Sequence, residues 1–243
     1  MITQSSIAPL QNVSLCSAAI SRALSRPNGL PGILAFYGPS GYGKSVAATY
    51  SSNKHRAYYV QCKSAWTKKA FLMALLREMG VQPVRTIPEM VDQAAQEIAL
   101  SGRPLIIDEA DFLVEKNIIE IVRDIYESTF CPILLIGEEQ LPAKLKKFER
   151  FHNRVLQWIQ AQPVNLQEAG SLAKIYAPGI EIHDNLMQSI MEASRHVTRR
   201  VCVNLNLVNE VAKKEGWHEV DASLWGKREL YTGQGTIRKG VSL

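Results

Sequence analysis

The chain has 243 residues, of which 46% are hydrophobic and 21% charged, and its formal net charge is +5. This composition is typical of a globular protein with one full core and a smaller appendage, and it excludes a disordered or fibrous chain. No apolar run reaches the roughly 18 residues of a membrane-spanning helix, so we expect no membrane contact. The N-terminus lacks a basic segment followed by an apolar one, and the cysteines are scattered among apolar residues. Both features predict a cytoplasmic protein with reduced thiols.

Up to about residue 164, short apolar runs alternate with segments of helical spacing. The predicted strands are 33–37, 57–62, 104–108, 132–136 and 155–158. The predicted helices are 12–25, 45–52, 67–80, 88–100 and 116–128. Asn12 or Ser14 is expected to cap the first helix, and Thr67 the third. Strands that alternate with helices imply right-handed crossovers, so we predict an α/β fold with a mostly parallel sheet sandwiched by helices.

From Asn165 onward the pattern changes to helices alone, which predicts a small C-terminal all-helical lid. The predicted lid helices are 167–176, 184–195 and 198–214. The last ten residues are expected to be flexible. The predicted organisation is an N-terminal helix and lead-in at 1–30, a core at 31–164, a lid at 165–216 and a partly flexible tail at 217–243.

A glycine-rich loop follows the first predicted strand and fits the pattern G-x-x-x-x-G-K-[ST] in full. The backbone N–H groups of such a loop cradle phosphates, while Lys44 reaches the β and γ oxygens and Ser45 ligates Mg²⁺. The helix that begins at this point adds a dipole that favours an anion. The loop therefore predicts that the chain binds ATP with Mg²⁺, through Gly38, Pro39, Ser40, Gly41, Tyr42, Gly43, Lys44, Ser45 and Val46.

Two acids follow the third strand, where the carboxyl ends of parallel strands face a bound ligand. Asp108 is expected to hold Mg²⁺, and Glu109 to polarise the water that attacks the γ-phosphate. The alternative is that Asp108 and Glu109 only cap the next helix, and a capping role is what we expect for Asp111.

Phosphoryl transfer needs positive charge at the γ-phosphate, and a neighbouring chain often supplies it. Arg154 stands directly before an apolar run, at the edge of an element, and could act in trans. Arg154 ends a basic segment, 144–154, and Lys146 and Lys147 of this segment are expected to be solvated.

The phosphate loop, the Asp108–Glu109 pair, a fourth strand followed by polar residues, and Arg154 occur in an order that resembles the AAA+ ATPases. Among these the chain looks most like the DNA transposition regulators, the phage Mu B-type target-capture proteins and their TniB/IstB-like relatives. The likeness covers residues 12–215, and its narrower part is carried by 59–67, 76–80, 108–113 and 135–139.

The resemblance implies a P-loop AAA+ fold and a role for three further residues. Arg154 matches the arginine finger of the family. Arg199 matches the lid arginine that senses nucleotide, with Arg200 as a close competitor. Glu138 takes the position of the residue that orients the attacking water, where Asn, Ser or Thr is more usual, and this difference favours slow, switch-like hydrolysis.

Mu B carries an N-terminal helix-turn-helix domain, and residues 1–32 ahead of the first strand are too few for one. DNA contact is therefore expected from the core, in the region that faces the central pore of the resembling proteins. Ammonium groups and a helix N-terminus both bind phosphate without reading sequence. The candidates are Lys63, Trp66, Thr67, Lys68 and Lys69, with Lys116 and Arg123 as weaker ones. The alternative is a solvated helix start with Trp66 packed on the surface.

The resemblance implies an ATPase that forms a ring or helical filament on duplex DNA, without sequence specificity, and directs a transposase in a bacterial or phage-infected cell. Two alternatives stay open. One is a helicase loader of the replication type, and the other is a nucleotide-gated interaction module that does not bind DNA.

Overall fold

The computed structural model describes residues 8–234, which divide into two compact units. One unit is Gln11–Gln162, and the other is Pro163–Leu243 together with Met1–Leu10. Residues 235–243, most of the C-terminal segment expected to be flexible, lie outside the described residues. Among those described, no helix has the length and apolarity needed to cross a membrane.

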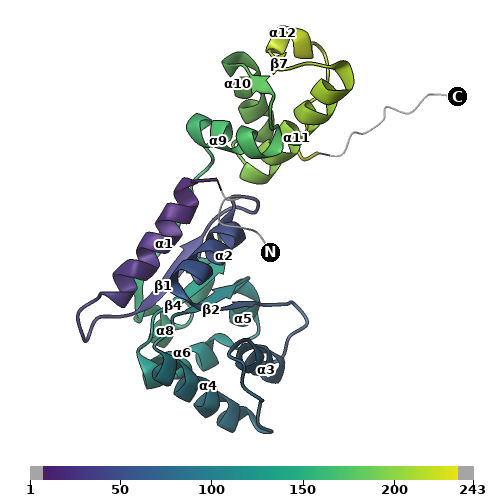
Figure 1. The fold of residues 1–243 in the computed structure, drawn as a ribbon. Coiled ribbons are helices and arrows are strands. Elements are labelled where there is room, and N and C mark those ends of the chain that lie inside the picture. Colours follow the sequence, from purple (N-terminus) through teal and green to yellow (C-terminus); the bar gives the residue numbers. More distant parts are fainter. Residues whose placement is uncertain (1–7, 235–243) are drawn as a thin grey trace, which may run out of the picture. The chain divides into compact units, whose positions relative to one another are not determined.

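The unit Gln11–Gln162 is built on a five-stranded sheet in the order β2-β3-β4-β1-β5, and every neighbouring pair is parallel (Figure 1). The strands are β1 Ile33–Tyr37, β2 Tyr58–Gln61, β3 Leu105–Asp108, β4 Ile133–Gly137 and β5 Val155–Gln160. The longer helices are α1 Gln11–Leu24, α2 Lys44–His55, α3 Lys68–Glu78, α4 Ile87–Ser101 and α6 Ile119–Thr129. The shorter helices are α5 Asp111–Glu115, α7 Leu141–Leu145 and α8 Glu149–His152. The predicted parallel sheet between helices is confirmed.

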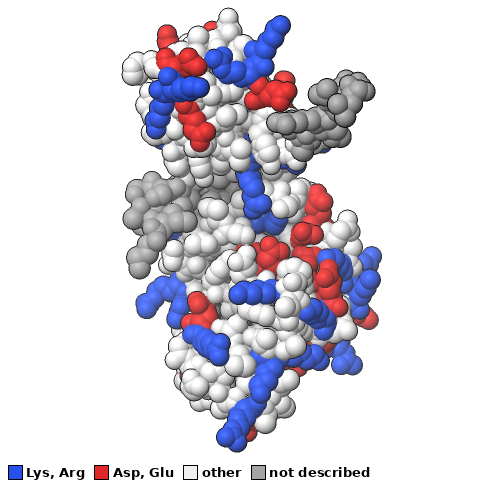
Figure 2. Space-filling view, turned by 90° about the vertical axis from the view of Figure 1, so that its right-hand side faces the viewer, with Lys and Arg blue, Asp and Glu red and all other residues white. Residues whose placement is uncertain are grey.

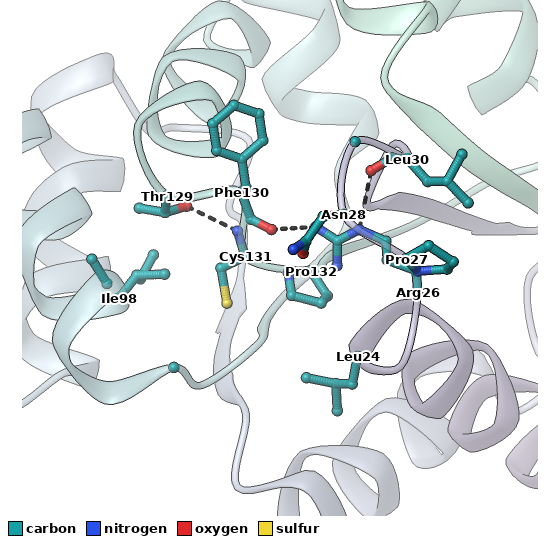
Figure 3. Close-up of a pocket in the computed structure, with 13 residues that line it drawn as sticks. Leu24, Arg26, Pro27, Asn28, Leu30, Ile98, Thr129, Phe130, Cys131 and Pro132 are labelled. Atoms are coloured by element: carbon teal, nitrogen blue, oxygen red, sulfur yellow. Dashed lines mark hydrogen bonds between the residues drawn. The ribbon is translucent and has the colours of Figure 1, made fainter.

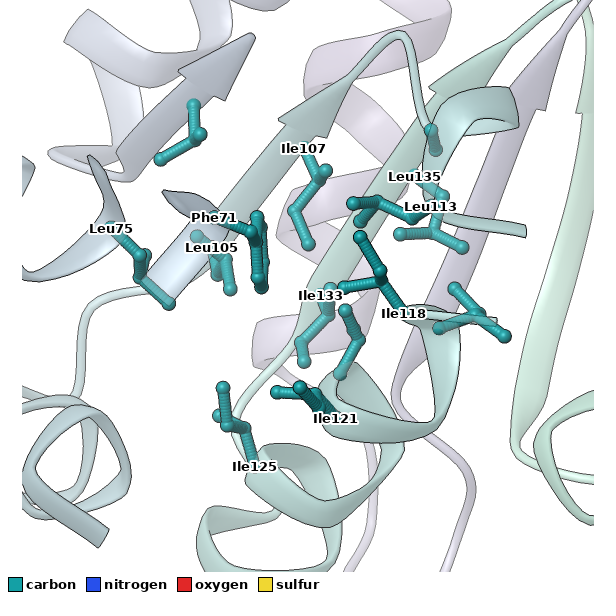
Figure 4. Packing of buried hydrophobic residues seen from close by; sticks show 14 of the residues in the cluster. Phe71, Leu75, Leu105, Ile107, Leu113, Ile118, Ile121, Ile125, Ile133 and Leu135 are labelled. Carbon is teal, nitrogen blue, oxygen red and sulfur yellow. The ribbon is translucent and has the colours of Figure 1, made fainter. Parts of the chain in front are cut away.

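Both faces of the central strands β1, β3 and β4 are buried because these strands are apolar at nearly every position, whereas the edge strand β5 is mostly half-buried. Helices α3, α4 and α6 cover one face, where Phe71 and Leu75 of α3 pack near Leu105 and Ile107 of β3 (Figure 4). On the same face, α6 supplies a row of isoleucines that includes Ile125. Helices α1 and α2 pack on each other and on the other face. This two-sided burial holds the carboxyl ends of the strands at one rigid edge.

Helix starts follow the expected chemistry at two positions and differ at a third. The Thr67 hydroxyl accepts a hydrogen bond from the N–H of Ala70 and caps α3, as predicted. Thr86 and Glu89 form a capping box at the start of α4. Helix α1 begins at Gln11, so the prediction that Asn12 or Ser14 caps it is wrong. Asn12 lies inside the first turn and is buried.

The predicted helix 116–128 is found as α6, which begins at Ile119, and a separate short helix that was not predicted, α5, precedes it. Between them, Asn117 adopts a left-handed backbone with φ 54°, which breaks the helical path. The break places α5 directly after the acids of β3, where it contributes to the candidate site.

The C-terminal unit contains the three predicted helices as α9 Leu166–Tyr176, α10 Asp184–Ser194 and α11 Thr198–Glu215, followed by α12 Ala222–Trp225. It also contains a short parallel pair, β6 Glu181–Ile182 and β7 Glu219–Val220, that the helical pattern did not predict. Strands of two residues are too short to show a periodicity in sequence.

Candidate nucleotide-binding site

The phosphate loop joins β1 to α2 at the carboxyl edge of the sheet. Gly41 and Gly43 have φ of 84° and 81°, a left-handed conformation that glycine adopts without steric cost. Gly43 is the residue that precedes α2, and no side chain caps this helix. The first N–H groups of α2 are therefore directed at the loop, as a phosphate cradle requires.

Lys44 lies within this loop and faces the acids of the neighbouring strands. Its Nζ donates hydrogen bonds to the carbonyl oxygens of Gly38, at 2.6 Å, and Pro39, at 2.8 Å. Burial lowers the pKa of Lys44, while the nearby carboxylates of Asp108, Glu109, Glu138 and Asp111 oppose this shift. Four acids that lie at or after the ends of β3 and β4 thus act electrostatically on this lysine.

Asp108 is held rigidly at the end of β3. It is only 2% exposed, and its Oδ2 accepts a hydrogen bond of 2.9 Å from the hydroxyl of Tyr59 on β2. Its Oδ1 accepts the N–H of Glu109, also at 2.9 Å. Burial, then the charge of Asp108, raises the pKa of Tyr59, so the hydroxyl keeps its proton and stays a donor. Tyr59 is not among the site residues predicted from the sequence, because only the pairing of β2 with β3 brings its hydroxyl to Asp108.

Glu109 has a backbone conformation that is rare for its residue type, with φ 56°. This left-handed turn ends the strand and redirects the side chain. Burial, followed by the charges of Asp108 and Glu138, raises its pKa, whereas Lys44 lowers it. The residue before α5 is Ala110, and no side chain caps that helix. The alternative in which Asp108 and Glu109 serve only as helix caps is therefore wrong.

Asp111 is not a helix cap either, because its carboxylate is used elsewhere. It is 4% exposed; Oδ2 accepts the N–H of Glu138 at 2.7 Å, and Oδ1 accepts Nζ of Lys144 at 2.7 Å. Lys144 also reaches Glu115 at 2.7 Å. Burial opposes protonation of Lys144, but the hydrogen bonds to Asp111 and Glu115 raise its pKa to about 12. Asp111 therefore ties the end of β4, with Glu138, to α5.

Arg154 lies at the opposite edge of the sheet from the phosphate loop. Its carbonyl accepts the N–H of Ile33 at the start of β1, whereas the loop follows Tyr37 at the other end. Strand residues rise about 3.3 Å each, so the two edges are roughly 13 Å apart. The guanidinium pairs with Glu127 of α6. Within one chain, Arg154 is not part of the phosphate site.

The two candidate sensor arginines lie in the first turn of α11, in the C-terminal unit. Arg199 is exposed. Arg200 is half-buried and packs so closely on Gly233 that a Cβ there would lie 2.6 Å from Nε of the arginine. Because Arg200 is engaged within its own unit, this difference favours Arg199 as the residue that is free to meet a ligand.

Among the residues expected to contact DNA, Lys63, Lys68 and Lys69 are exposed around the start of α3. Trp66 is half-buried and packs against the core, and the hydroxyl of Thr67 is used as a cap. These two residues shape the segment, whereas the three lysines are available to a phosphate backbone. On the face shown in Figure 2, Lys and Arg side chains are spread out with acids between them, so no single basic patch dominates this face.

The donor set fits Mg²⁺, which prefers one or two carboxylates together with phosphate oxygens over a cage made wholly by protein. Asp108 offers a buried carboxylate and Ser45 an exposed hydroxyl at the start of α2. Within residues 8–234, no three His, Cys, Asp or Glu side chains gather into a metal site of their own.

A hollow of about 620 Å³ lies at the other edge of the sheet, before β1 and β4 (Figure 3). Arg26 occupies it and donates to the carbonyl oxygens of Ala23, Leu30 and Phe130. Leu30 and Phe130 also expose apolar side chains there. Because the guanidinium is committed to backbone oxygens, this hollow is not a second phosphate site.

Comparison with known proteins agrees with this geometry. Residues 28–145 match the family described as "AAA domain". No curated protein sequence matches the chain. Similar solved structures include the Aeropyrum pernix ORC2 protein in its ADPNP–ADP complexes, with TM-score 0.68 and 14% identity over 92% of this chain and 68% of that one.

Two further structures are similar. The Aeropyrum pernix ORC1 protein in complex with DNA has TM-score 0.61 and 16% identity over 88% of this chain and 62% of that one. The Thermotoga maritima RuvB Holliday junction branch migration motor has TM-score 0.61 and 18% identity over 92% of this chain and 70% of that one. At these identities the likeness shows the fold alone. Residues 28–145 are therefore similar to an AAA domain, and the chain has a P-loop fold like that of the AAA+ ATPases.

Proposed function

We propose that the protein is an ATPase whose nucleotide state controls binding to duplex DNA, and that on target DNA it assembles and directs a transposase. The observation that carries the ATPase part is the placement of Lys44 opposite the acids of β3 and β4. A glycine-rich cradle, a cation for the phosphates and a half-buried Glu of raised pKa are the groups that γ-phosphate hydrolysis needs.

Each residue at this edge has a proposed role. The loop N–H groups and Lys44 bind the phosphates, and Ser45 and Asp108 hold Mg²⁺. Mg²⁺, when bound, neutralises charge on the phosphate oxygens. Glu109 accepts a proton from the attacking water, and its raised pKa makes it a stronger base than an exposed Glu. Glu138, whose N–H is held by Asp111, orients that water.

Arg154 is proposed to complete the site of a neighbouring copy. Its position at the far edge of the sheet supports action in trans, since its own phosphate loop is out of reach. The ion pair with Glu127 would have to open for the guanidinium to reach a γ-phosphate. Arg199 is proposed to sense the nucleotide from the C-terminal unit.

Nucleotide-controlled DNA binding is supported by the exposed lysines 63, 68 and 69 and by the similar structure of an ORC1 protein that holds DNA. The segment lies next to the catalytic strand, because Gln61 pairs with Asp108 and the N–H of Cys62 donates to the carbonyl of Asp108 at 2.9 Å. A movement of the backbone at Asp108 and Glu109 would therefore shift the end of β2, which leads into the proposed DNA contact. The transposition role depends on the family likeness of residues 59–67 and 108–113.

Duplex binding tests this proposal when it is measured with ATP, ADP and no nucleotide. We expect tight binding with ATP only, and a log–log salt slope approaching one for each phosphate neutralised. Changing Lys63, Lys68 and Lys69 together to Glu should abolish DNA binding but leave ATP binding intact. A matched control changes the exposed Lys213, Lys214 and Lys227 to Glu, which alters net charge equally. Equal loss in both variants would point to net charge rather than to this segment.

A second candidate is a helicase loader of the replication type, which the likeness to the ORC1 and ORC2 proteins and to Cdc6p from Pyrobaculum aerophilum favours. Titration of single strands against duplex separates the two. Preference for single strands, together with binding to a hexameric helicase, would select the loader. Stimulation of a transposase on protein-coated duplex would select the first candidate.

A further inference from the structure

Asn12, near the start of α1, makes three hydrogen bonds of 2.8 Å. Its Nδ2 donates to the carbonyl oxygens of Tyr42 and Gln162, and its Oδ1 accepts the N–H of Gln162. The side chain is 5% exposed. A flipped amide would face oxygen with oxygen and N–H with N–H, so the chemistry of the three partners fixes one orientation. Both amide hydrogens are used, and no other uncharged side chain of this length could satisfy all three partners.

The partners of Asn12 come from two functionally distinct places in the chain. Tyr42 lies inside the phosphate loop, between Gly41 and Gly43. Gln162 is the last residue of the unit Gln11–Gln162, and the chain enters the C-terminal unit at Pro163. Asn12 is therefore a bridge between the phosphate loop and the exit from the ATPase unit.

A second set of contacts joins the other end of the loop to the same exit segment. The N–H of Ala161 donates to the carbonyl of Tyr37 at 2.7 Å. Gly38, the first residue of the loop, lies so close that a Cβ there would be 3.0 Å from Cβ of Ala161. Residues 161 and 162 thus contact the loop near both of its ends, through a close packing contact and through Asn12.

Helix α1, which carries Asn12, is itself held in place by packing. The helix buries Cys16 and Ile20, and it packs on α2. The Ser17 hydroxyl also lies 3.1 Å from Nε2 of His55, at the far end of α2. Because α1 and α2 are joined in this way, the amide of Asn12 keeps a fixed position relative to the loop that leads into α2.

Peptide geometry shows what the bridge does. The carbonyl of Tyr42 and the N–H of Gly43 belong to one planar trans peptide, so they point in opposite directions. Holding the Tyr42 oxygen at Asn12 therefore sets the direction of the Gly43 N–H, one of the donors of a phosphate cradle.

We propose that Asn12 is a positioning residue that orients the phosphate loop and couples it to the exit segment 161–162. Nucleotide binding at the loop is thereby transmitted to the attachment of the C-terminal unit. This inference rests on the proposed nucleotide binding, and it gives α1 a role in the ATPase cycle.

Two substitutions separate the parts of the bridge. Asn12→Asp has the same shape and keeps the acceptor for the N–H of Gln162, but it loses both donors and so releases the Tyr42 oxygen. Asn12→Leu is neutral and loses all three bonds. Ser14→Asp is the control for charge, because it places a carboxylate on the exposed side of the same helical turn.

The measurements are the Kd of a non-hydrolysable ATP analogue, the melting temperature, and amide exchange at Gln162 followed by NMR. Without nucleotide, the Gln162 amide should be protected in the wild type and in Asn12→Asp, and should exchange faster in Asn12→Leu. With the analogue, its exchange should slow further in the wild type only. Both Asn12 variants should bind the analogue about tenfold more weakly, a loss of about 1.4 kcal/mol, whereas Ser14→Asp should match the wild type.

Folded Asn12 variants with wild-type affinity and a wild-type exchange response to the analogue would overturn the proposal. A wild-type protein that does not bind the analogue would instead refute the nucleotide site itself. The wild-type arm alone reveals that failure, so the two results are distinguishable.

Discussion

At the scale of single residues, the chemistry of the site depends on carboxylates that lie close together. Each oxygen of Asp108 accepts one hydrogen bond, from the Tyr59 hydroxyl or from the Glu109 N–H, and this orients the carboxylate for its proposed role as a Mg²⁺ ligand. Glu109 is less buried, has a raised pKa and sits on a left-handed backbone that aims it away from the strand. These different environments support the different roles that we propose for the two adjacent acids.

Glu109→Gln should leave nucleotide affinity nearly unchanged and lower the hydrolysis rate by about 100-fold or more, because the amide cannot accept a proton. Phosphate release and nucleotide Kd measure the two effects. The nucleotide-bound, DNA-assembled state should also persist longer in this variant. Glu139→Gln, at an exposed neighbour of Glu138, is the matched control. Hydrolysis at the wild-type rate in Glu109→Gln would rule out Glu109 as the base.

The pH dependence of the hydrolysis rate should reflect the protonation of Glu109. The residue acts when deprotonated and its pKa is raised, so the rate should fall with decreasing pH at a higher pH than an exposed Glu would give. Glu138 is one of the charges that raise this pKa. Glu138→Gln should therefore move the acid limb of the pH–rate profile to lower pH, whatever it does to the maximal rate. An unmoved limb would contradict the electrostatic coupling of these two acids.

At the scale of elements, the ends of β3 and β4 are tied together by Asp111. The carboxylate leaves no room at Gly137, where a Cβ would lie 2.3 Å from Oδ2 of Asp111 and 2.8 Å from Cδ2 of Leu141. The glycine is thus needed for close approach and not for an unusual backbone. The same tie sets where the loop that carries Glu138 stands relative to Glu109.

Gly137→Ala should displace the Asp111 carboxylate and break its bond to the N–H of Glu138. Overpacking of this kind costs about 1–3 kcal/mol of stability. The maximal rate should fall while the nucleotide Kd stays close to that of the wild type, because the phosphate loop is untouched. Asp111→Asn, which retains an acceptor for Glu138 but loses the ion pair with Lys144, should have a smaller effect. Denaturation and steady-state hydrolysis measure both.

Gly170→Ala is the matched control for that prediction. It adds the same methyl group inside α9, where nothing lies within 4 Å of the new Cβ. It should stabilise the protein slightly, because alanine favours a helix by roughly 1 kcal/mol over glycine. If Gly137→Ala also stabilised the protein, the close packing of Gly137 on Asp111 would not contribute to stability or to the hydrolysis rate.

At the scale of the whole molecule, the phosphate loop and the proposed arginine finger lie at opposite ends of the strands of one sheet. The phosphate loop and the acids lie at the carboxyl edge, and Arg154 lies at the amino edge. A parallel sheet makes this separation unavoidable, since all its strands start at one edge and end at the other. The proposed action of Arg154 in trans therefore requires that the amino end of one sheet meets the carboxyl end of the sheet in a neighbouring copy.

Mixing two inactive variants tests this arrangement. Lys44→Ala should not bind nucleotide productively, and Arg154→Ala should bind it but hydrolyse it at least about 100-fold more slowly. If Arg154 acts in trans, a mixture should regain part of the activity, because some interfaces pair an intact loop with an intact arginine. The specific activity of the wild type should also rise with protein concentration. Arg150→Ala, at an exposed residue of α8, should behave as wild type. A mixture no more active than its two components would indicate that Arg154 does not act in trans and only forms the ion pair with Glu127.

The features that the sequence by itself determined are local in the chain. The phosphate loop follows from a short run of glycines before Lys44, the buried strands from continuous apolar residues, and the cap of α3 from Thr67. In each case residues within a few positions decide the backbone, through allowed φ angles, burial or a single hydrogen bond.

Only the tertiary structure decided the partners of the polar side chains. Asp111 meets Glu138, Tyr59 meets Asp108, and Asn12 meets both Tyr42 and Gln162, across 27, 49, 30 and 150 positions of the chain. Asp111 and Asn12 had been expected to act at helix starts, since a short polar side chain there usually bonds its own backbone. The parallel crossovers of the sheet bring distant strand ends to one edge, where a buried donor or acceptor bonds whichever complementary group the fold places beside it.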